Sequence, residues 1–151
     1  MENITVKETI AGIIAACETL FAEYVQIEED YKKNDGNAAL CIIDAGGNVY
    51  GKMFGNDKIK MRETYRIAWT KASQVHITGI RTGDFEKLVF NGEINDKQFG
   101  IERQHFIGWR GGLPVTLQDG ATIAIAFSGF RGVTDVALLE RAVAIAAAGG
   151  K

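Results

Sequence analysis

The residues best suited to chemistry lie close together in one stretch, residues 103–114. Arg103 and Arg110 carry planar guanidinium groups that can hold a carboxylate through two hydrogen bonds. Trp109 offers a flat ring for stacking. Three glycines that would let a ligand approach backbone donors lie in the same stretch: Gly108, Gly111 and Gly112. These residue types suit a planar anionic ligand, and the alternative is a glycine turn between strands with exposed arginines and a core tryptophan.

The chain has two histidines, His76 and His105. Imidazole is a common axial ligand of haem iron and a common general acid or base. His105 stands beside the glycine-rich segment, so it is the first candidate for a metal ligand and for a catalytic residue. His76 lies on the apolar stripe of a predicted helix and is the second candidate ligand, with a core or interface histidine as the alternative.

Two further arginines, Arg62 and Arg66, lie four residues apart and therefore on one face of the same predicted helix. They are candidates to clamp an acidic ligand. The alternative is that they are solvated or paired with an acid of this chain, such as Glu63 or Asp57. Lys71 also falls off the apolar stripe of this helix, which predicts a surface position.

Composition and charge exclude several classes of protein. The chain has 151 residues and 17 Lys and Arg against 19 Asp and Glu, a net charge of −2, whereas nucleic-acid-binding domains are usually strongly basic. It has no run of about 18 uncharged apolar residues that could span a membrane, and no basic-then-apolar signal pattern at its start. Cys17 and Cys41 lie in apolar segments and are expected to be buried thiols. We expect a cytoplasmic protein that binds neither nucleic acid nor membrane.

Apolar spacing predicts the helices that must position these residues. Thr5 followed by Glu8 forms a capping box at the start of a long N-terminal helix, whose apolar positions continue to Tyr31. The acidic residues 28–30 are expected on its solvated face. Further helical segments are expected at residues 61–79, 84–90 and 134–148.

Short apolar runs separated by glycine turns predict strands. The pair Asp119-Gly120 between two such runs is a strong hairpin signal. The expected strands are residues 38–44, 49–54, 105–109, 113–117 and 121–130. Because the turns are tight, the sequence predicts an α+β fold in one domain over residues 1–151. Its five-stranded antiparallel sheet would carry a long N-terminal helix, a central helix and a C-terminal helix.

Several of these motifs occur together in a known family. They are Asp44-Ala45-Gly46-Gly47, Lys71-Ala72, Gly111-Gly112-Leu113-Pro114-Val115, Asp119-Gly120 and Ser128-Gly129, followed by an Ala-rich helix. In this order, over nearly the whole chain, the sequence resembles the GlcG/HbpS-like haem-degrading family, which includes the C-terminal domain of PduO-type proteins. The resemblance implies a five-stranded antiparallel sheet, a homo-oligomer, and haem or another small planar ligand. The first predicted helix contains no His, so it offers no haem ligand.

Three hypotheses of different classes follow. The leading one is a small-molecule-binding protein whose ligand is planar and anionic, with haem the favoured cofactor; an extended form of this hypothesis has the protein degrade the ligand as well as bind it. The second is a small catabolic enzyme that acts on an organic acid or its reactive product, with His105 as general acid or base. The third is an oligomeric interaction protein without a small-molecule site, in which His105 and Trp109 lie between subunits.

Overall fold

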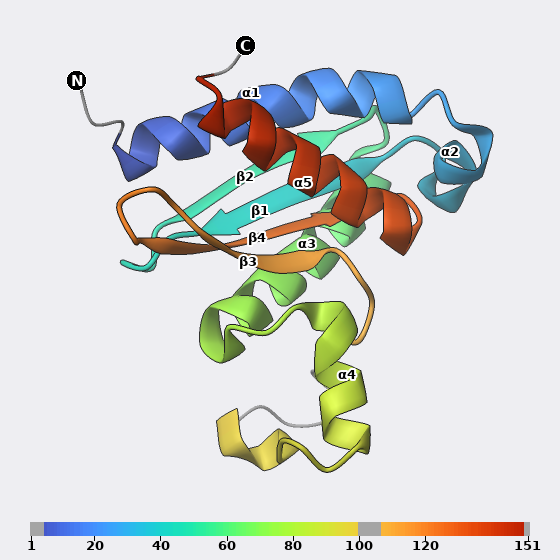
Figure 1. Ribbon diagram of the computed structural model, residues 1–151. Coiled ribbons are helices and arrows are strands. Elements are labelled where there is room, and N and C mark those ends of the chain that lie inside the picture. The colour runs from blue at the N-terminus through green and yellow to red at the C-terminus, as the bar shows by residue number, and fades with distance from the viewer. Residues whose placement is uncertain (1–4, 100–106, 150–151) are drawn as a thin grey trace.

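The computed structural model describes residues 5–99 and 107–149 (Figure 1). The chain runs through α1 (Val6–Tyr24), α2 (Glu28–Asn34), β1 (Ala38–Ile43) and β2 (Val49–Phe54). It continues through α3 (Lys58–Thr78), α4 (Thr82–Phe90) and a 3-10 helix, η1 (Asp96–Phe99). It ends with β3 (Gly112–Thr116), β4 (Thr122–Ser128) and α5 (Gly132–Ala147). The α+β class is confirmed, and the expected helical segments are all present.

The start of the N-terminal helix follows the sequence prediction, but its end does not. Thr5 Oγ1 accepts a hydrogen bond from the Glu8 backbone at 3.1 Å, as the capping box predicts. The helix ends at Tyr24, and α2 follows at an angle of 109° instead of continuing it. The bend turns Asp30 inward, where it is buried against the start of α5, so the predicted solvated face at residues 28–30 is wrong for this residue.

Within residues 5–99 and 107–149 the sheet has four strands in the order β2-β1-β4-β3, and every neighbouring pair is antiparallel. The antiparallel arrangement and the two hairpins are therefore confirmed. In the β1–β4 register Ala39 pairs with Ser128, so β4 ends beside the start of β1. This places Ser128 and the following turn at the edge where α5 begins (Figure 1).

The sequence predicts a fifth strand at residues 105–109. This prediction is wrong for residues 107–109, the described part of the segment, because they do not form a strand. The Gln74 side chain of α3 takes the place of a strand partner. Its Oε1 accepts from Ile107 N at 2.9 Å, and its Nε2 donates to Ile107 O at 3.0 Å. Trp109 O accepts from the Thr82 hydroxyl at 2.6 Å. Two side chains thus satisfy backbone groups that the apolar pattern had assigned to a sheet.

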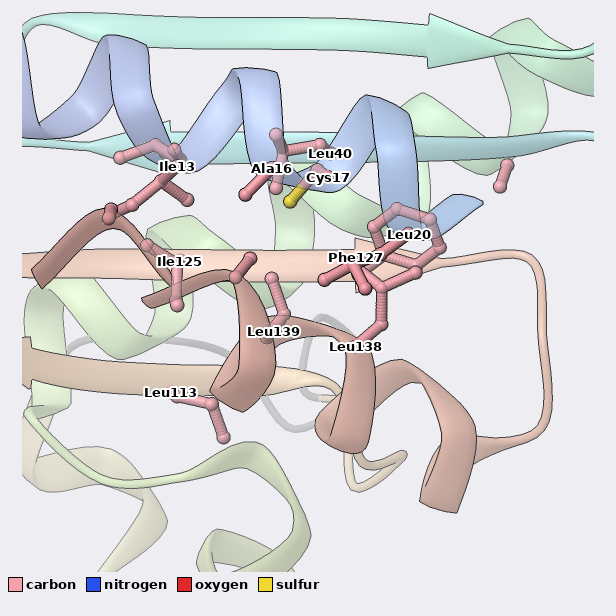
Figure 2. Close-up of a cluster of buried hydrophobic side chains, with 14 of the residues drawn as sticks. Ile13, Ala16, Cys17, Leu20, Leu40, Leu113, Ile125, Phe127, Leu138 and Leu139 are labelled. Atoms are coloured by element: carbon pink, nitrogen blue, oxygen red, sulfur yellow. The ribbon is translucent and has the colours of Figure 1, made fainter. Parts of the chain in front are cut away.

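The sheet separates two layers (Figure 1). On one face α1 and α5 enclose the larger core, in which Leu20, Phe127 and Leu138 lie together (Figure 2). On the other face α3 packs against small residues of the sheet, namely Ala39, Cys41 and Ala126, through its own Ala68 and Ala72. Small side chains on both surfaces bring α3 close to the sheet, which positions its Lys71 beneath the end of β4.

The helix α3 begins three residues earlier than the sequence predicts. Asp57 is its N-cap, and its Oδ1 accepts from the backbone of Ile59 at 3.0 Å and of Lys60 at 3.1 Å. An aspartate at this position satisfies backbone donors that the first helical turn leaves unpaired.

Within the described residues, no single helix has the length and apolarity needed to cross a membrane. The α1–α2 pair meets that test only when the two helices are counted together, and it is bent by 109°. Apolar residues of α1, such as Ile13 and Leu20, are buried in the core. This burial is the ordinary reason for a helix of a folded core to be rich in apolar residues.

Candidate functional site

A cavity of about 450 Å³ opens where the end of β4, the start of α5, helix α3 and residues 109–110 meet. We call it the Lys71 cavity. Its volume falls in the range of small-molecule sites, about 300–1,000 Å³. Its lining consists of Lys33, Asn34, Glu63, Thr64, Ile67, Lys71, Trp109, Arg110, Ser128, Gly129, Phe130, Gly132 and Asp135.

A buried ion pair forms one wall of the Lys71 cavity. Lys71 Nζ lies 3.6 Å from Asp135 Oδ2, and each side chain is only 3% exposed. Lys71 Nζ also donates to Phe127 O at 3.0 Å, and Asp135 Oδ1 accepts from Phe130 N at 3.2 Å. The pair thereby joins α3, the end of β4 and the first turn of α5.

Burial changes the proton affinity of both partners. Removal from water disfavours the charged form of each group. Burial accordingly lowers the pKa of Lys71, although the attraction of Asp135 opposes this. Burial raises the pKa of Asp135 to about 8, against the opposing effect of Lys71. Burial therefore moves the pKa of the amine down and that of the carboxyl up, so the two groups differ less in proton affinity than they would in water.

The glycine at position 111 is required by this ion pair. Gly111 has a φ of +117°, and a Cβ there would lie 2.6 Å from Phe127 O and 2.8 Å from Lys71 Nζ. A Cβ at Gly112 would lie 2.7 Å from the Thr82 methyl group. Both glycines are needed for close packing within the protein, whereas the sequence analysis assigned them to the approach of a ligand.

Two of the predicted site residues stand at the opening of the Lys71 cavity. Trp109 is 65% exposed, an unusual environment for a large aromatic ring, and Arg110 is exposed beside it. Arg110 also lines a second cavity, of about 380 Å³, between α4, β3 and α5. Gly111 and Gly112 line that second cavity together with Arg81, Lys87 and Glu140.

The charges around the Lys71 cavity favour an anion. Lys33 and Arg110 contribute exposed cations to the lining, and α5 begins there at Gly132. The start of a helix carries a partial positive charge. Glu63 is the exposed anion of the lining, and it is paired with Arg66 at 3.0 Å. The accessible side chains left to meet a ligand are therefore mainly cationic and aromatic.

The structure does not place the other described site candidates beside Trp109 and Arg110. Arg62 Nη1 lies 3.9 Å from Glu63 and Arg66 also pairs with Glu63, which is the alternative that the sequence analysis allowed. His76 is exposed on α3, and it is not among the described residues that line the two cavities. Arg103 and His105 lie outside the described residues.

The sequence analysis missed the Lys71–Asp135 pair. Lys71 was placed off the apolar stripe, but it is 2% exposed, so that prediction is wrong. A signal was present, because the buried residues Thr64, Ala68, Lys71 and Val75 follow a three–four spacing along α3. Asp135 carried no such signal, because an acid in the first turn of a helix is common at the surface.

Comparison with known proteins gives structural likenesses only. No family model matches the chain, and no curated protein matches it. The crystal structure of Klebsiella pneumoniae protein ORFY, described with the family model DUF336, has a TM-score of 0.68 at 19% identity and covers 98% of this chain and 95% of that one. The structure of a PduOC–haem complex has a TM-score of 0.68 at 15% identity, covering 95% and 94%. That of HbpS has a TM-score of 0.55 at 17% identity, covering 96% and 91%.

These likenesses confirm, at the level of the fold, the resemblance to GlcG/HbpS-like proteins that the sequence predicts. They extend over nearly the full length of both chains in each comparison. At these sequence identities, the structural likenesses establish the fold that surrounds the Lys71 cavity. They show nothing about what the cavity binds.

Proposed function

Starting from this shared fold, we propose that the protein is a GlcG/HbpS-like protein that binds a planar anionic small molecule in the Lys71 cavity. One observation carries the proposal. An exposed Trp109 and Arg110 stand at the opening of a cavity of about 450 Å³ whose wall holds the buried Lys71–Asp135 pair. An aromatic face beside unpaired cations is the chemistry that recognises a conjugated carboxylate.

Haem is the candidate ligand to test first, because one structure of the same fold is a complex with haem. The described lining suits the flat face and the carboxylates of a porphyrin through Trp109, Arg110 and Lys33. When bound, haem would supply a redox-active iron.

The described lining does not suit the iron itself, since it contains no imidazole and no thiol. Cys17 and Cys41 lie in the core, where burial raises the pKa of the thiols to about 12 and about 11, so neither is a thiolate at neutral pH. Among the described residues, no three His, Cys, Asp or Glu side chains gather as a metal site. His105 lies outside those residues, and we derive no reaction through iron.

The proposal is tested by titrating the purified protein with hemin and following the Soret absorbance, with lysozyme as the nonspecific control. We expect saturable binding of defined stoichiometry. Trp109→Ala should weaken it about two- to tenfold, because stacking contributes roughly 0.5–1.5 kcal/mol, and Arg110→Gln should weaken it several-fold. Trp69→Ala and Arg62→Gln are matched controls, because these residues are exposed on α3 and are not among the cavity-lining residues.

His105→Ala and His76→Ala complete the panel, because only a histidine that ligates iron should change the Soret maximum when it is removed. Binding no tighter than to lysozyme, or equal losses in the Trp109 and Trp69 variants, would reject the Lys71 cavity as a hemin site.

The Lys71–Asp135 pair favours a second candidate, an enzyme that acts on an organic acid. A buried amine beside a carboxyl of raised pKa, both on the lining of a cavity, is an arrangement that catalytic centres use.

A further inference from the structure

We propose that Lys71 is an amine nucleophile that forms a reversible Schiff base with the carbonyl carbon of a 2-oxo acid bound in the Lys71 cavity. Asp135 would be the proton donor and acceptor for this step. The inference rests on the proposed function in one respect, since it requires that the cavity accept an anionic small molecule.

Placement distinguishes Lys71 from the other lysines. Among the lysines whose side chains the structure describes, only Lys71 is buried, whereas Lys58, Lys33 and the others are exposed or half-exposed. Lys71 nevertheless lines the cavity, as does Asp135. Phe127 O at 3.0 Å and Asp135 at 3.6 Å hold the Lys71 amine beside this space.

The surroundings supply what the reaction needs. An ammonium ion cannot attack a carbonyl, so the amine must be neutral, and burial lowers the pKa of Lys71 toward that condition. Burial also favours the protonated form of Asp135, which can then donate a proton. Arg110 and Lys33 are placed on the same cavity lining to hold the carboxylate of the oxo acid.

The step balances with these groups alone. The lone pair of the neutral Lys71 amine attacks the carbonyl carbon, and the carbon–oxygen π bond breaks. One amine proton moves to the oxygen, giving a carbinolamine. Protonated Asp135 then donates to the hydroxyl group, which leaves as water while the nitrogen lone pair forms the carbon–nitrogen double bond. The products are a protonated imine, the Asp135 carboxylate and one water molecule.

A structural role for the pair is the competing explanation, since buried ion pairs also join elements of a fold. The two explanations differ in reactivity. A purely structural lysine should react with carbonyl compounds no faster than the exposed lysines of the same chain, because its amine is less accessible.

The test is reductive trapping with pyruvate as the probe. The full-length protein is incubated with pyruvate near pH 7, reduced with sodium borohydride, and analysed by intact mass and peptide mapping. We expect a single adduct on Lys71, formed at least tenfold faster than on Lys58. Asp135→Asn should slow trapping at least tenfold, Lys71→Arg should abolish the adduct, and the exposed-lysine variant Lys58→Arg should leave it unchanged.

Separate binding measurements keep the two proposals distinguishable. Calorimetry with hemin and with pyruvate reports whether the cavity accepts either ligand. Binding without an adduct on Lys71 would overturn the Schiff-base inference and leave the proposed function standing, whereas neither binding nor trapping would overturn both. Trapping spread evenly over exposed lysines would also overturn the inference, and mapping on the wild-type protein gives this result even if a Lys71 variant fails to fold.

Discussion

At the scale of single residues, the site depends on a lysine that is kept out of water. Lys71 is held by Phe127 O and Asp135, and the absence of a side chain at Gly111 makes room for all three. The sequence associates Gly111 with the approach of a ligand, but its first role is to allow close packing within the protein. Its contribution can be measured separately from ligand binding.

Gly111→Ala should destabilise the protein by about 2–5 kcal/mol. The left-handed φ of +117° costs an alanine about 1–2 kcal/mol, and overpacking against Phe127 O and Lys71 Nζ adds about 1–3 kcal/mol. Gly120→Ala is the matched control, because its φ is +88° but a Cβ there meets nothing within 4 Å. Urea unfolding should show the larger loss for Gly111, and equal losses would show that the packing around Lys71 is not tight.

Two of the residues that the sequence offers as site candidates line the Lys71 cavity. Trp109 and Arg110 were predicted from residue type, because an aromatic ring and a guanidinium group beside glycines are informative wherever they occur. Lys71 was not, because an isolated lysine in a helical pattern is usually on the surface. Its burial depends on the small residues of the sheet opposite and on Asp135, which is 64 positions away in the chain, and local periodicity contains neither fact.

At the scale of elements, α2 is tied to α5 by one buried carboxylate. Asp30 Oδ1 accepts from the Arg131 backbone at 3.0 Å and from Arg131 Nε at 2.9 Å, and Oδ2 accepts from the Thr134 hydroxyl at 2.9 Å. These contacts fix the start of α5 beside the Lys71 cavity. They also account for the bend after α1. Apolar spacing alone does not show this bend, and it predicts one helix that continues to Tyr31.

Replacing Asp30 should therefore destabilise the fold. Asp30→Ala leaves the Thr134 hydroxyl and the Arg131 backbone N–H without their acceptor, at a cost of about 1–3 kcal/mol. Burial by itself would raise the pKa of Asp30, but hydrogen bonds from Arg131 and Thr134 outweigh it and hold the pKa below its usual value. The stabilisation is thus present above about pH 4, the unfolded value, and is lost as the pH falls through the lower folded pKa.

Thermal unfolding between pH 7 and pH 2 measures how the stabilisation by the Asp30 carboxylate depends on pH. The difference in stability between wild type and Asp30→Asn should shrink as the pH falls below about 4. Asp119→Asn, in the exposed turn between β3 and β4, serves as the control. A difference that stays constant over the whole range would contradict the assigned role of the Asp30 charge.

At the scale of the whole molecule, the hydrophobic core and the polar residues of the Lys71 cavity occupy different parts of the fold. The core between α1, α5 and the sheet is formed by hydrophobic side chains (Figure 2), whereas the polar residues that line the Lys71 cavity come from α3, the end of β4 and the start of α5. The order of elements and the antiparallel pairing followed from hydrophobic spacing and glycine turns. Residues 107–109, the described part of the predicted fifth strand, form no strand, because Gln74 and Thr82 satisfy the backbone of residues 107 and 109 instead.

The central claim, that the Lys71 cavity is the ligand site, is tested most directly by nuclear magnetic resonance. The ¹⁵N-labelled protein is titrated with gallium protoporphyrin, a diamagnetic planar dicarboxylate, and backbone amide shifts are mapped. We predict the largest changes at residues 128–135 and at the Trp109 indole, with little change on the exposed face of β2. Changes concentrated on β2, or around His76 with none at residues 128–135, would contradict the claim.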